Sequence, residues 1–138
     1  MREILFKAKR IEDGKWIEGY YQKRYGLLSN EEHLIFHADN YTVWEYAEID
    51  PETLCQFTGL YDKNGKNIWE NDILMAHLDE SCPEDVTYGT VEWNFTGWVL
   101  HESDSIDREF IDEFVTEYYE VAGNVFDNPE LLQEESDE

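Results

Sequence analysis

The sequence has little positive charge, and the shortage is concentrated in its second half. Its 138 residues carry 10 Lys or Arg against 33 Asp or Glu, a formal net charge of −23. From residue 67 onward, Arg108 is the only Lys or Arg, set against 21 acids. Such a surface repels nucleic-acid phosphates, because nucleic-acid binding is driven mostly by cations that displace counterions. Direct nucleic-acid binding is therefore not expected, whereas attraction to a basic protein is. The same charge also favours solubility.

Cysteine and long apolar runs are also scarce. The two cysteines, Cys55 and Cys82, are too few for a disulfide scaffold and lack the spacing of a metal site. No apolar run approaches the roughly 20 residues of a membrane span. The opening MREILFKAKR is charged throughout and has no apolar core, so no secretion signal is expected. The expected compartment is a reducing cytoplasm, without membrane association.

Aromatic residues, by contrast, are plentiful. They make up 15% of a chain that is 41% hydrophobic, a composition typical of a folded, β-rich protein rather than of disorder. Short stretches with period-two alternation, bounded by turn residues, predict strands. These lie near residues 3–10, 15–22, 33–38, 41–46, 55–62, 67–78, 86–94, 97–103 and 118–126.

Four local signals add turns and helices to these strands. Asp13-Gly14 and Asn64-Gly65 predict hairpin turns. Asp50-Pro51 predicts a single helical turn near residues 50–54. A short helix is predicted at 104–115, where a Ser or Asp can cap its start and four apolar residues fall on one face. Those four residues are Ile106, Phe110, Ile111 and Phe114.

The predicted fold class is mainly β with one or two short helices. We expect an SH3-like small barrel plus an N-terminal antiparallel β section. The N-terminal section is residues 1–49, and the barrel core is residues 50–132, with the 104–115 helix over one open end. Residues 133–138 are expected to form a disordered acidic tail.

The segment DKNGKNIWENDIL, residues 62–74, raises the question of a phosphate-binding loop. Such a loop needs Gly, four residues, and then Gly-Lys-Ser/Thr. Here Gly59 and Gly65 are separated by five residues, and Lys66 is followed by Asn67. The spacing is wrong and the hydroxyl that would bind magnesium is missing. A tight turn at Asn64-Gly65 is the better interpretation.

Carboxylates and histidines offer candidate chemistry. Glu70 and Asp72 could share one face of a strand, as paired acids or cation ligands do. A solvated hairpin edge is the favoured interpretation of this pair. Asp79 and Glu80 follow in an acidic loop and complete the candidate acidic binding residues. A metal-dependent enzyme acting on nucleotides or phosphodiesters is an alternative hypothesis, which would also draw on Asp85 and Glu92.

No catalytic constellation supports that alternative. His33 and His37 are four residues apart, but nothing supplies a clear third metal ligand. No Ser lies in a nucleophile elbow, and neither cysteine has an identifiable base partner. We therefore assign no catalytic residue, no metal ligand and no cofactor, and expect a protein that is not an enzyme.

The stretch KWIEGYYQKRY, residues 15–25, is the only basic-aromatic segment. Trp16, Tyr20 and Tyr21 are its candidate binding residues. Such a composition can stack the bases of single-stranded nucleic acid. Packing of its aromatic residues into the β core is the favoured interpretation. A third possibility is that it docks on the acidic portion of a second copy, which would give a homo-oligomer.

Three blocks of sequence occur in an order that resembles the YopX family of small phage and prophage proteins. They are REILFKAK with GKWIEGYY, then DPETL with QFTGLYDKNGKNIWENDIL, and finally EVAGNVFDNPELL. The resemblance implies a β-rich protein of the bacterial host cytoplasm and brings no biochemical activity or catalytic residue. Asn71 stands where the family usually has glycine, and Asn is the best non-glycine residue at positive φ. Ala122 stands where the family favours a larger aliphatic residue.

Charge and resemblance together suggest a non-enzymatic phage accessory protein that binds a protein partner through an acidic surface. A narrower version is a nucleic-acid mimic that binds a basic host protein. The other alternative is a structural or assembly component.

Overall fold

The computed structural model describes residues 4–40, 43–77, 81, 85–102 and 105–132, and it is mainly β. This confirms the fold class that period-two alternation predicts. The strands are β1 (Phe6–Lys9), β2 (Trp16–Tyr25), β3 (Glu31–Asn40), β4 (Val43–Glu48), β5 (Cys55–Tyr61), β6 (Asn67–Trp69), β7 (Asp72–Ala76), β8 (Thr87–Asn94), β9 (Gly97–Glu102), β10 (Arg108–Phe110) and β11 (Glu120–Asn124). The helices are η1 (Pro51–Thr53), α1 (Glu113–Tyr118) and η2 (Pro129–Leu132), of which η1 and η2 are 3-10 helices.

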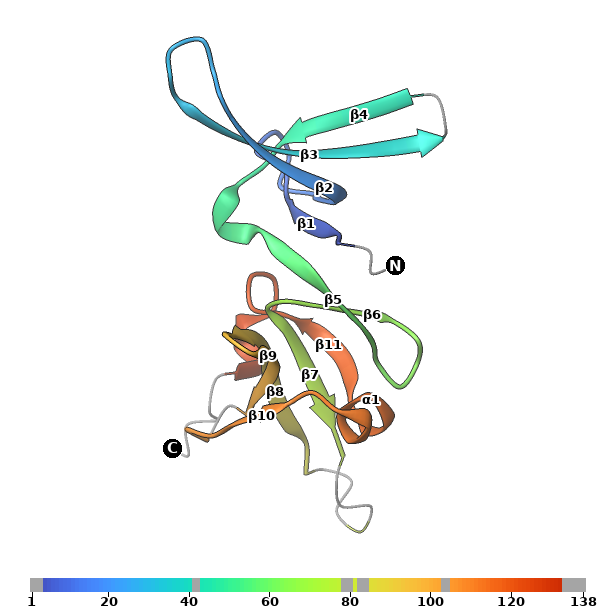
Figure 1. Ribbon diagram of the computed structural model, residues 1–138. Coiled ribbons are helices and arrows are strands. Elements are labelled where there is room, and N and C mark those ends of the chain that lie inside the picture. Colours follow the sequence, from blue (N-terminus) through green and yellow to red (C-terminus); the bar gives the residue numbers. More distant parts are fainter. Residues whose placement is uncertain (1–3, 41–42, 78–80, 82–84, 103–104, 133–138) are drawn as a thin grey trace. The chain divides into compact units, whose positions relative to one another are not determined.

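The strands form two antiparallel sheets, and neither closes into a barrel. One sheet has the order β4-β3-β2-β1-β5-β6, and the other has the order β10-β9-β8-β7-β11 (Figure 1). A barrel requires the two edge strands of a sheet to pair with each other, and β10 and β11 do not pair over their described residues. The SH3-like small barrel is therefore not confirmed. Two compact units, Met1–Phe57 and Thr58–Glu138, meet within β5, and we call them the first and second units.

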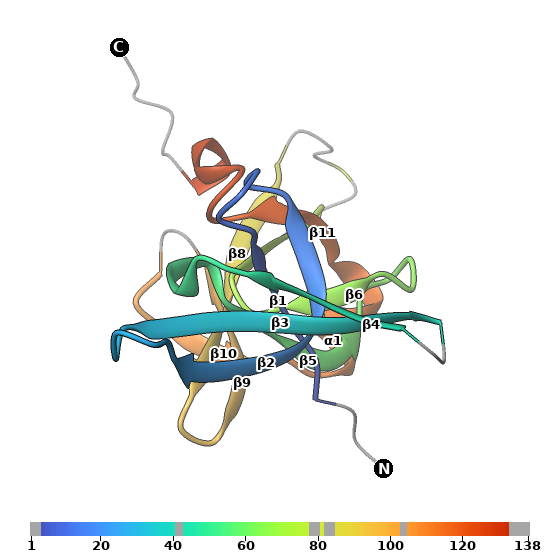
Figure 2. The same ribbon diagram turned by 90° about the horizontal axis from the view of Figure 1, so that it is seen from above.

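In the first unit, β1 to β4 follow one another as antiparallel neighbours, and β2, β3 and β4 are seen side by side from above in Figure 2. The predicted Asp13-Gly14 turn is confirmed, with Gly14 at φ +71° between β1 and β2. Ala8 pairs with Ile17 in this hairpin, and both belong to a buried cluster with Ile35 and Ile49. Burying an isoleucine side chain stabilises a fold by about 1.5–3 kcal/mol, so the three isoleucines contribute most of the stabilisation from this cluster.

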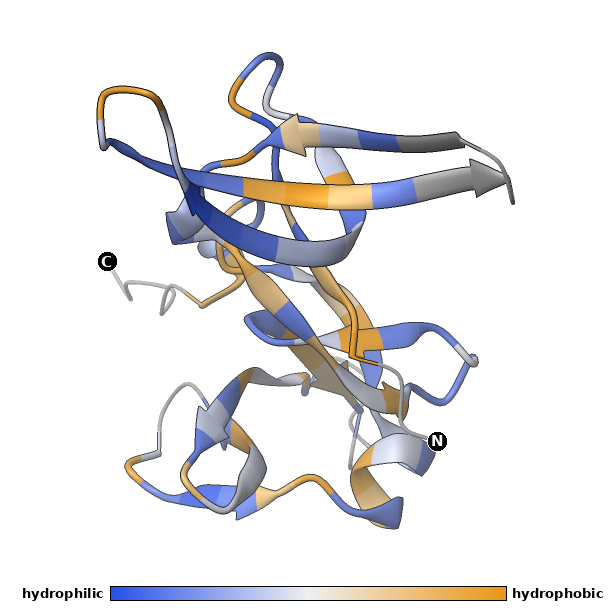
Figure 3. Cartoon of the chain, turned by 45° about the horizontal axis from the view of Figure 1, so that its top comes forward, coloured by the Kyte–Doolittle hydropathy of each residue, from blue (hydrophilic) through white to orange (hydrophobic). Residues whose placement is uncertain are grey.

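The hairpin of β2 and β3 buries its middle and exposes its tip. Hydrophobic residues occupy the middle of β3 and also the loop before it (Figure 3). In the strand, Leu34 and Ile35 are buried, whereas in the loop Leu27 and Leu28 are fully exposed. The loop is closed by the amide of Gly26, which donates to the carbonyl oxygen of Asn30 at 2.8 Å. The two leucines therefore contribute to the surface and not to the core.

The predicted helical turn after β4 is confirmed as η1. Asp50 is its N-cap, and its carboxylate accepts a hydrogen bond from the amide of Glu52 at 3.0 Å. Pro51 occupies the first helical position, where its missing N–H has no cost.

The core of the second unit lies between the five-stranded sheet, β6 and α1. Its buried members come from β6, β7, β8, β9 and the helical segment, so strands distant in sequence share one apolar layer. They are Ile68, Leu74, Ala76, Val91, Trp98, Leu100, Val115 and Tyr119.

The turn between β5 and β6 is present but is longer than the two-residue hairpin that the sequence suggests. Gly65 has φ +79°, but Asn64 does not have a positive φ. The amide of Gly65 donates to the carbonyl oxygen of Asp62 at 2.9 Å. The turn therefore spans residues 62–65 and contains one left-handed residue at its end, as in a three-residue hairpin loop.

The sequence predicts one continuous strand over residues 67–78, but the structure has two strands there. β6 ends at Trp69 and β7 begins at Asp72, with Asn71 at φ +70° between them. Three consecutive polar residues, Glu70-Asn71-Asp72, interrupt the apolar pattern at this turn, and the prediction of one strand overlooks that interruption. The left-handed backbone at Asn71 agrees with its place at a position where the family usually has glycine.

The helix predicted at 104–115 is present but is wrong in its bounds. Residues Arg108–Phe110 form β10, which pairs with β9, and the helix α1 begins only at Glu113. Its N-cap is Asp112, whose carboxylate accepts from the amide of Val115 at 3.2 Å. Pairing with β9 outweighs the weak helical preference of this short amphipathic stretch, because isolated short helices are marginal in water. Residues 103–104 of the predicted helix and the predicted tail at 133–138 lie outside the described residues.

Candidate functional site

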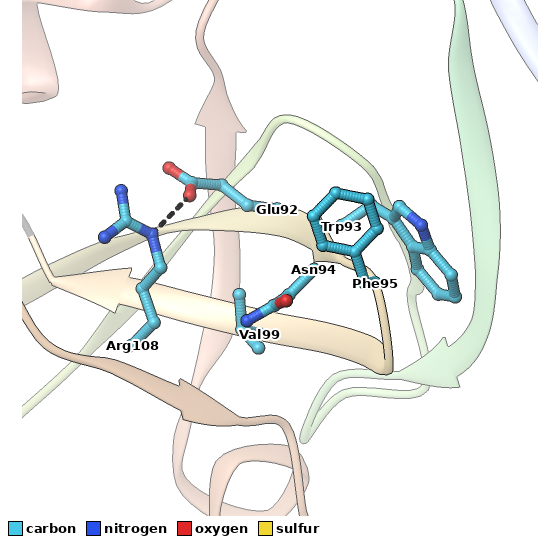
Figure 4. Close-up of a pocket in the computed structure, with 6 residues that line it drawn as sticks. All are labelled: Glu92, Trp93, Asn94, Phe95, Val99 and Arg108. Carbon is cyan, nitrogen blue, oxygen red and sulfur yellow. Dashed lines mark hydrogen bonds and ion pairs between the residues drawn. The ribbon is translucent and has the colours of Figure 1, made fainter.

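A pocket of about 260 Å³ lies on the β8–β9 hairpin beside β10 in the second unit (Figure 4). The two strands are joined by the loop Phe95-Thr96, as predicted, and Asn94 pairs with Gly97 at its base. β10 runs along the other side of β9, with Arg108 paired to His101. The pocket is lined by Glu92, Trp93, Asn94, Phe95, Val99 and Arg108.

Strand register places the main pocket residues on one face of the sheet. Glu92 and Phe110 are both cross-strand partners of Val99, so the three side chains project from the same face. Arg108 precedes Phe110 by two residues and therefore shares this face. Val99 is buried and forms the floor. Figure 4 shows the Arg108 side chain extending from β10 past Val99 to Glu92 on β8.

An ion-pair network fixes the polar wall of the pocket. The Arg108 Nε atom donates to Glu92 Oε1 at 2.9 Å, and His101 Nδ1 lies 3.0 Å from Glu92 Oε2. The other nitrogen of His101 is 2.7 Å from the carbonyl oxygen of Ser105. Burial alone would raise the pKa of Glu92, but hydrogen bonds and charges from Arg108 and His101 outweigh burial and hold this pKa below its usual range. The Glu92 carboxylate therefore stays ionised, and Arg108 and His101 each contact one of its oxygens.

Exposed aromatic residues form the apolar rim. Phe95, at the tip of the hairpin, is 98% exposed, and Phe110 is 59% exposed. The Phe110 ring lies over Gly97, where an added Cβ would be 3.4 Å from a ring carbon. Large exposed aromatic side chains beside a pocket are typical of interaction sites, because exposure to water costs free energy that a partner recovers.

The lining offers a ligand apolar surface and one ion pair. Its one acid, Glu92, is already held by Arg108 and His101, and its other side chains carry indole, amide, phenyl, isopropyl and guanidinium groups. Sequence reasoning missed Phe95 and Arg108 as site residues. Two signals point to them: an aromatic residue at a hairpin tip, where polar residues are usual, and the only cation in an acidic half-chain.

The acidic candidates from the sequence do not form a group at this pocket. Asp72 is buried, and its Oδ2 atom accepts from the amide of Trp69 at 2.8 Å, so it closes the turn before β7. Glu70 is half-buried within that turn and does not share a strand with Asp72. Asp79 and Glu80 lie outside the described residues.

The two remaining acids named by the enzyme hypothesis, Asp85 and Glu92, have different surroundings. Asp85 is exposed before β8, whereas Glu92 belongs to the pocket network. Among the residues that the structure describes, no three His, Cys, Asp or Glu side chains come together as a cation site.

The basic-aromatic segment is divided between the two faces of β2. Trp16 lies beneath two lysines, with Lys7 Nζ 4.8 Å and Lys9 Nζ 5.5 Å from its ring centroid. Tyr20 is 48% exposed. Tyr21 faces the other way and packs against the first unit's buried cluster. The three candidates therefore do not make one continuous surface, since alternate residues of a strand point to opposite faces.

The two histidines four residues apart lie on β3, where that spacing corresponds to about 13 Å along the strand. Each has its own partner. His33 Nδ1 is 2.6 Å from the Tyr21 hydroxyl oxygen, and His37 Nε2 is 3.3 Å from Glu45 Oε2. They are too far apart to ligate one metal ion.

Asp62, which no sequence pattern singles out, accepts three backbone hydrogen bonds. Its Oδ1 atom accepts from the amides of Asn64 at 2.8 Å and Lys66 at 2.9 Å. Its Oδ2 atom accepts from the amide of Val121 at 2.9 Å. Burial tends to raise the pKa of Asp62, but the three backbone amides outweigh burial and lower this pKa below its usual range. Asp62 thus joins the β5–β6 turn to β11.

Asn71 makes a second junction through its backbone. Its amide donates to the carbonyl oxygen of Val91 at 2.8 Å, and its carbonyl oxygen accepts from the amide of Val125 at 3.0 Å. The central and closing blocks of the YopX-like pattern are thus held together by hydrogen bonds at Asp62 and Asn71. None of the pocket residues belongs to those blocks, so the pattern describes the fold and not the pocket.

Comparison with known proteins gives a family and a fold. The profile of the family described as YopX protein matches residues 5–133. A solved structure, the crystal structure of protein EF1440 from Enterococcus faecalis, is similar with a TM-score of 0.62 and 22% identity. That alignment covers 96% of this chain and 100% of that chain. No curated protein matches the sequence.

These observations define a protein of two open antiparallel sheets with a small surface pocket on the second unit. The match spans nearly the whole chain, so the chain belongs to the YopX family. At 22% identity the likeness to protein EF1440 concerns the fold alone. None of the helices in the described part of the chain is long and apolar enough to cross a membrane.

Proposed function

We propose that this protein is a phage or prophage accessory protein that binds a basic protein partner through the acidic surface of its second unit, in the cytoplasm of the bacterial host. The observation that carries the proposal is the charge of residues 67–138, in which 21 acids accompany one Arg. That one Arg is paired to Glu92. Most of the other acids of this stretch have no cation within it to neutralise them, so a negative potential surrounds this part of the protein.

The segment around α1 supports this view. Between residues 107 and 117 the acids are all exposed, and Arg108 is the only Lys or Arg among them. These acids are Asp107, Glu109, Asp112, Glu113 and Glu117. Exposed like charges repel one another, and a basic partner relieves that repulsion while it gains attraction of its own.

A pull-down from host lysate at increasing salt tests the proposal. At low ionic strength the immobilised protein should retain basic proteins, and retention should fall as the screening length shrinks from about 10 Å at 0.1 M salt to about 3 Å at 1 M. A variant with all five exposed acids of residues 107–117 changed to their amides serves as the control and should retain less. If the wild-type protein retains no basic protein at low salt, the proposed function is wrong.

A further inference from the structure

We propose that the partner docks on the pocket face of the second unit, defined as Glu92, Asn94, Phe95, Arg108 and Phe110. The pocket itself takes one aromatic side chain from a Lys/Arg-rich segment of that partner. The basic character of the partner rests on the proposed function, whereas the location of the site and the aromatic anchor rest on the pocket.

The size of the pocket favours a side chain over a free small molecule. Its volume is about 260 Å³. Sites for drug-sized ligands and cofactors enclose roughly 300–1,000 Å³ and bury most of the ligand. This pocket is smaller and lies on the surface of a hairpin, with Phe95 at its rim almost fully exposed. A single protruding aromatic ring matches that space.

The composition of the pocket face is that of an interface centre. Aromatic residues and Arg are enriched where partners contribute most binding energy, and they act from desolvated pockets. Here the floor is Val99, two phenyl rings stand beside it, and the Arg108 guanidinium forms one wall. An aromatic ring that entered the pocket could pack on Phe95 and face the guanidinium of Arg108, a favourable cation–π arrangement.

The charge around the pocket selects a basic segment. Arg108 is compensated by Glu92, so the pocket face does not present an unpaired cation to a basic partner. Glu109 alternates with Arg108 and Phe110 and so points to the opposite face. The exposed acids Asp107 and Asp112, however, lie at the two ends of β10. Lys or Arg residues that flank an aromatic anchor can therefore pair with these acids.

Another exposed apolar surface lacks these features. The leucines at the tip of the β2–β3 hairpin are more exposed than Phe110. However, the tip, residues 26–30, contains no aromatic residue and no Lys, Arg, Asp or Glu. We therefore place the anchor at the pocket and use the leucine tip as a control.

Two synthetic peptides with the same charge test the site on the full-length protein. Each alternates Lys with Ser, and they differ only at the central position, which is Trp in one peptide and Ala in the other. Affinities are measured by titration calorimetry at low salt. Burying an aromatic side chain should make the Trp peptide bind about tenfold more tightly than the Ala peptide.

Three variants locate the anchor. Phe95→Ser should abolish most of the difference between the two peptides, and because the Phe95 side chain is exposed, the fold should be unchanged by circular dichroism. Phe114→Ser, on α1 of the same unit, and Leu27→Ser, at the leucine tip, are matched controls. Both should keep the preference for the Trp peptide.

Arg108→Gln distinguishes binding in the pocket from attraction by charge alone, because the two predict opposite changes in the affinity of the Trp peptide. The substitution makes the protein more negative, so attraction by charge alone predicts tighter binding of both peptides. Loss of a pocket wall predicts weaker binding of the Trp peptide, with less change for the Ala peptide. If both peptides bind equally well, or if Phe95→Ser leaves the preference intact, the docking site is wrong while the acidic-surface function stands. If neither peptide binds wild-type protein at low salt, the proposed function fails and the docking site with it.

Discussion

At the scale of single residues, the parts of the sequence that look most functional are those that hold the fold together. The stretch around Gly65 resembles a ligand loop, yet Asp62 uses its carboxylate to bind three backbone amides there. Asp72 similarly accepts from the amide of Trp69. A buried carboxylate that satisfies backbone donors is costly to replace, because the amides would remain desolvated and unpaired. These two acids therefore have structural explanations that need no ligand.

Replacing Asp62 by Asn should lower the free energy of unfolding at neutral pH by about 1–3 kcal/mol. An amide side chain presents one acceptor oxygen and one donor group, so the amide of Val121 would lose its partner or face another donor. The measurement is urea denaturation followed by tryptophan fluorescence. Glu117→Gln, which removes a charge from an exposed position on α1, is the matched control and should change stability by less than about 0.5 kcal/mol.

The pH dependence of the Asp62→Asn effect has a fixed sign. The pKa of Asp62 is lower in the folded protein than in the unfolded chain, so its contribution to stability is complete above the unfolded pKa of about 3.9 and is lost as the pH falls through the folded value. The stability difference between wild type and Asp62→Asn should therefore shrink as the pH is lowered below about 4. A difference that grew on acidification would contradict this role.

Gly19 is required by close approach and not by backbone conformation. A Cβ at this position would overlap the carbonyl oxygen of Phe36 on β3. Gly19→Ala should therefore push β2 from β3 and destabilise the first unit by about 1–3 kcal/mol. Thermal unfolding by circular dichroism measures the loss. Gly14→Ala is an informative comparison, because nothing lies near its Cβ and only its positive φ opposes substitution. If Gly19→Ala were as stable as wild type, the close packing of β2 on β3 would be refuted.

At the scale of elements, local patterns predicted most strands. Errors arose where contacts with residues distant in sequence determine the secondary structure. The hairpin at Asp13-Gly14 and the β8–β9 hairpin follow from period-two alternation and nearby turn residues. The predicted bounds of the helix at 104–115 are wrong because β9 provides backbone partners that the local sequence does not reveal. Asp62 was missed for the same reason, since its bond to Val121 joins residues 59 positions apart. The pocket was missed because it needs three strands in register.

The true start of the helix makes an element-scale prediction. Asp112→Ala should cost about 1 kcal/mol, because it removes the acceptor that caps α1. Ser105 is one of three candidate caps, with Ser103 and Asp104, of the helix expected from the sequence, but its hydroxyl instead accepts from the amide of Asp107 in a short turn. Ser105→Ala should therefore cost less than Asp112→Ala in chemical denaturation. The reverse order would favour a helix that begins before Arg108.

At the scale of the whole molecule, the net charge of −23 determines how stability responds to salt. Attraction within ion pairs stabilises the fold, whereas repulsion among carboxylates destabilises it. Salt screens both kinds of interaction. The surface ion pairs, such as Arg24–Glu32 at 2.8 Å, lose strength as salt rises, and pairs this exposed contribute little to stability because water already screens them. Repulsion among an excess of carboxylates acts over the whole second unit and opposes the compact state. Repulsion should therefore outweigh the attraction within the ion pairs.

This balance predicts that added salt stabilises the protein. The midpoint of thermal unfolding should rise as sodium chloride increases from about 0.01 M to about 0.2 M, over which the screening length falls from about 30 Å to below about 10 Å. Most of the gain should come in that range, because repulsion between carboxylates farther apart than the screening length is then largely suppressed. Stabilisation by exclusion of salt from the surface would instead continue to grow at higher concentration and would be larger for sulfate. A midpoint that stayed constant or fell below 0.2 M would show that ion pairs outweigh repulsion, and the acidic surface would then lack the unrelieved charge with which a basic partner is expected to pair.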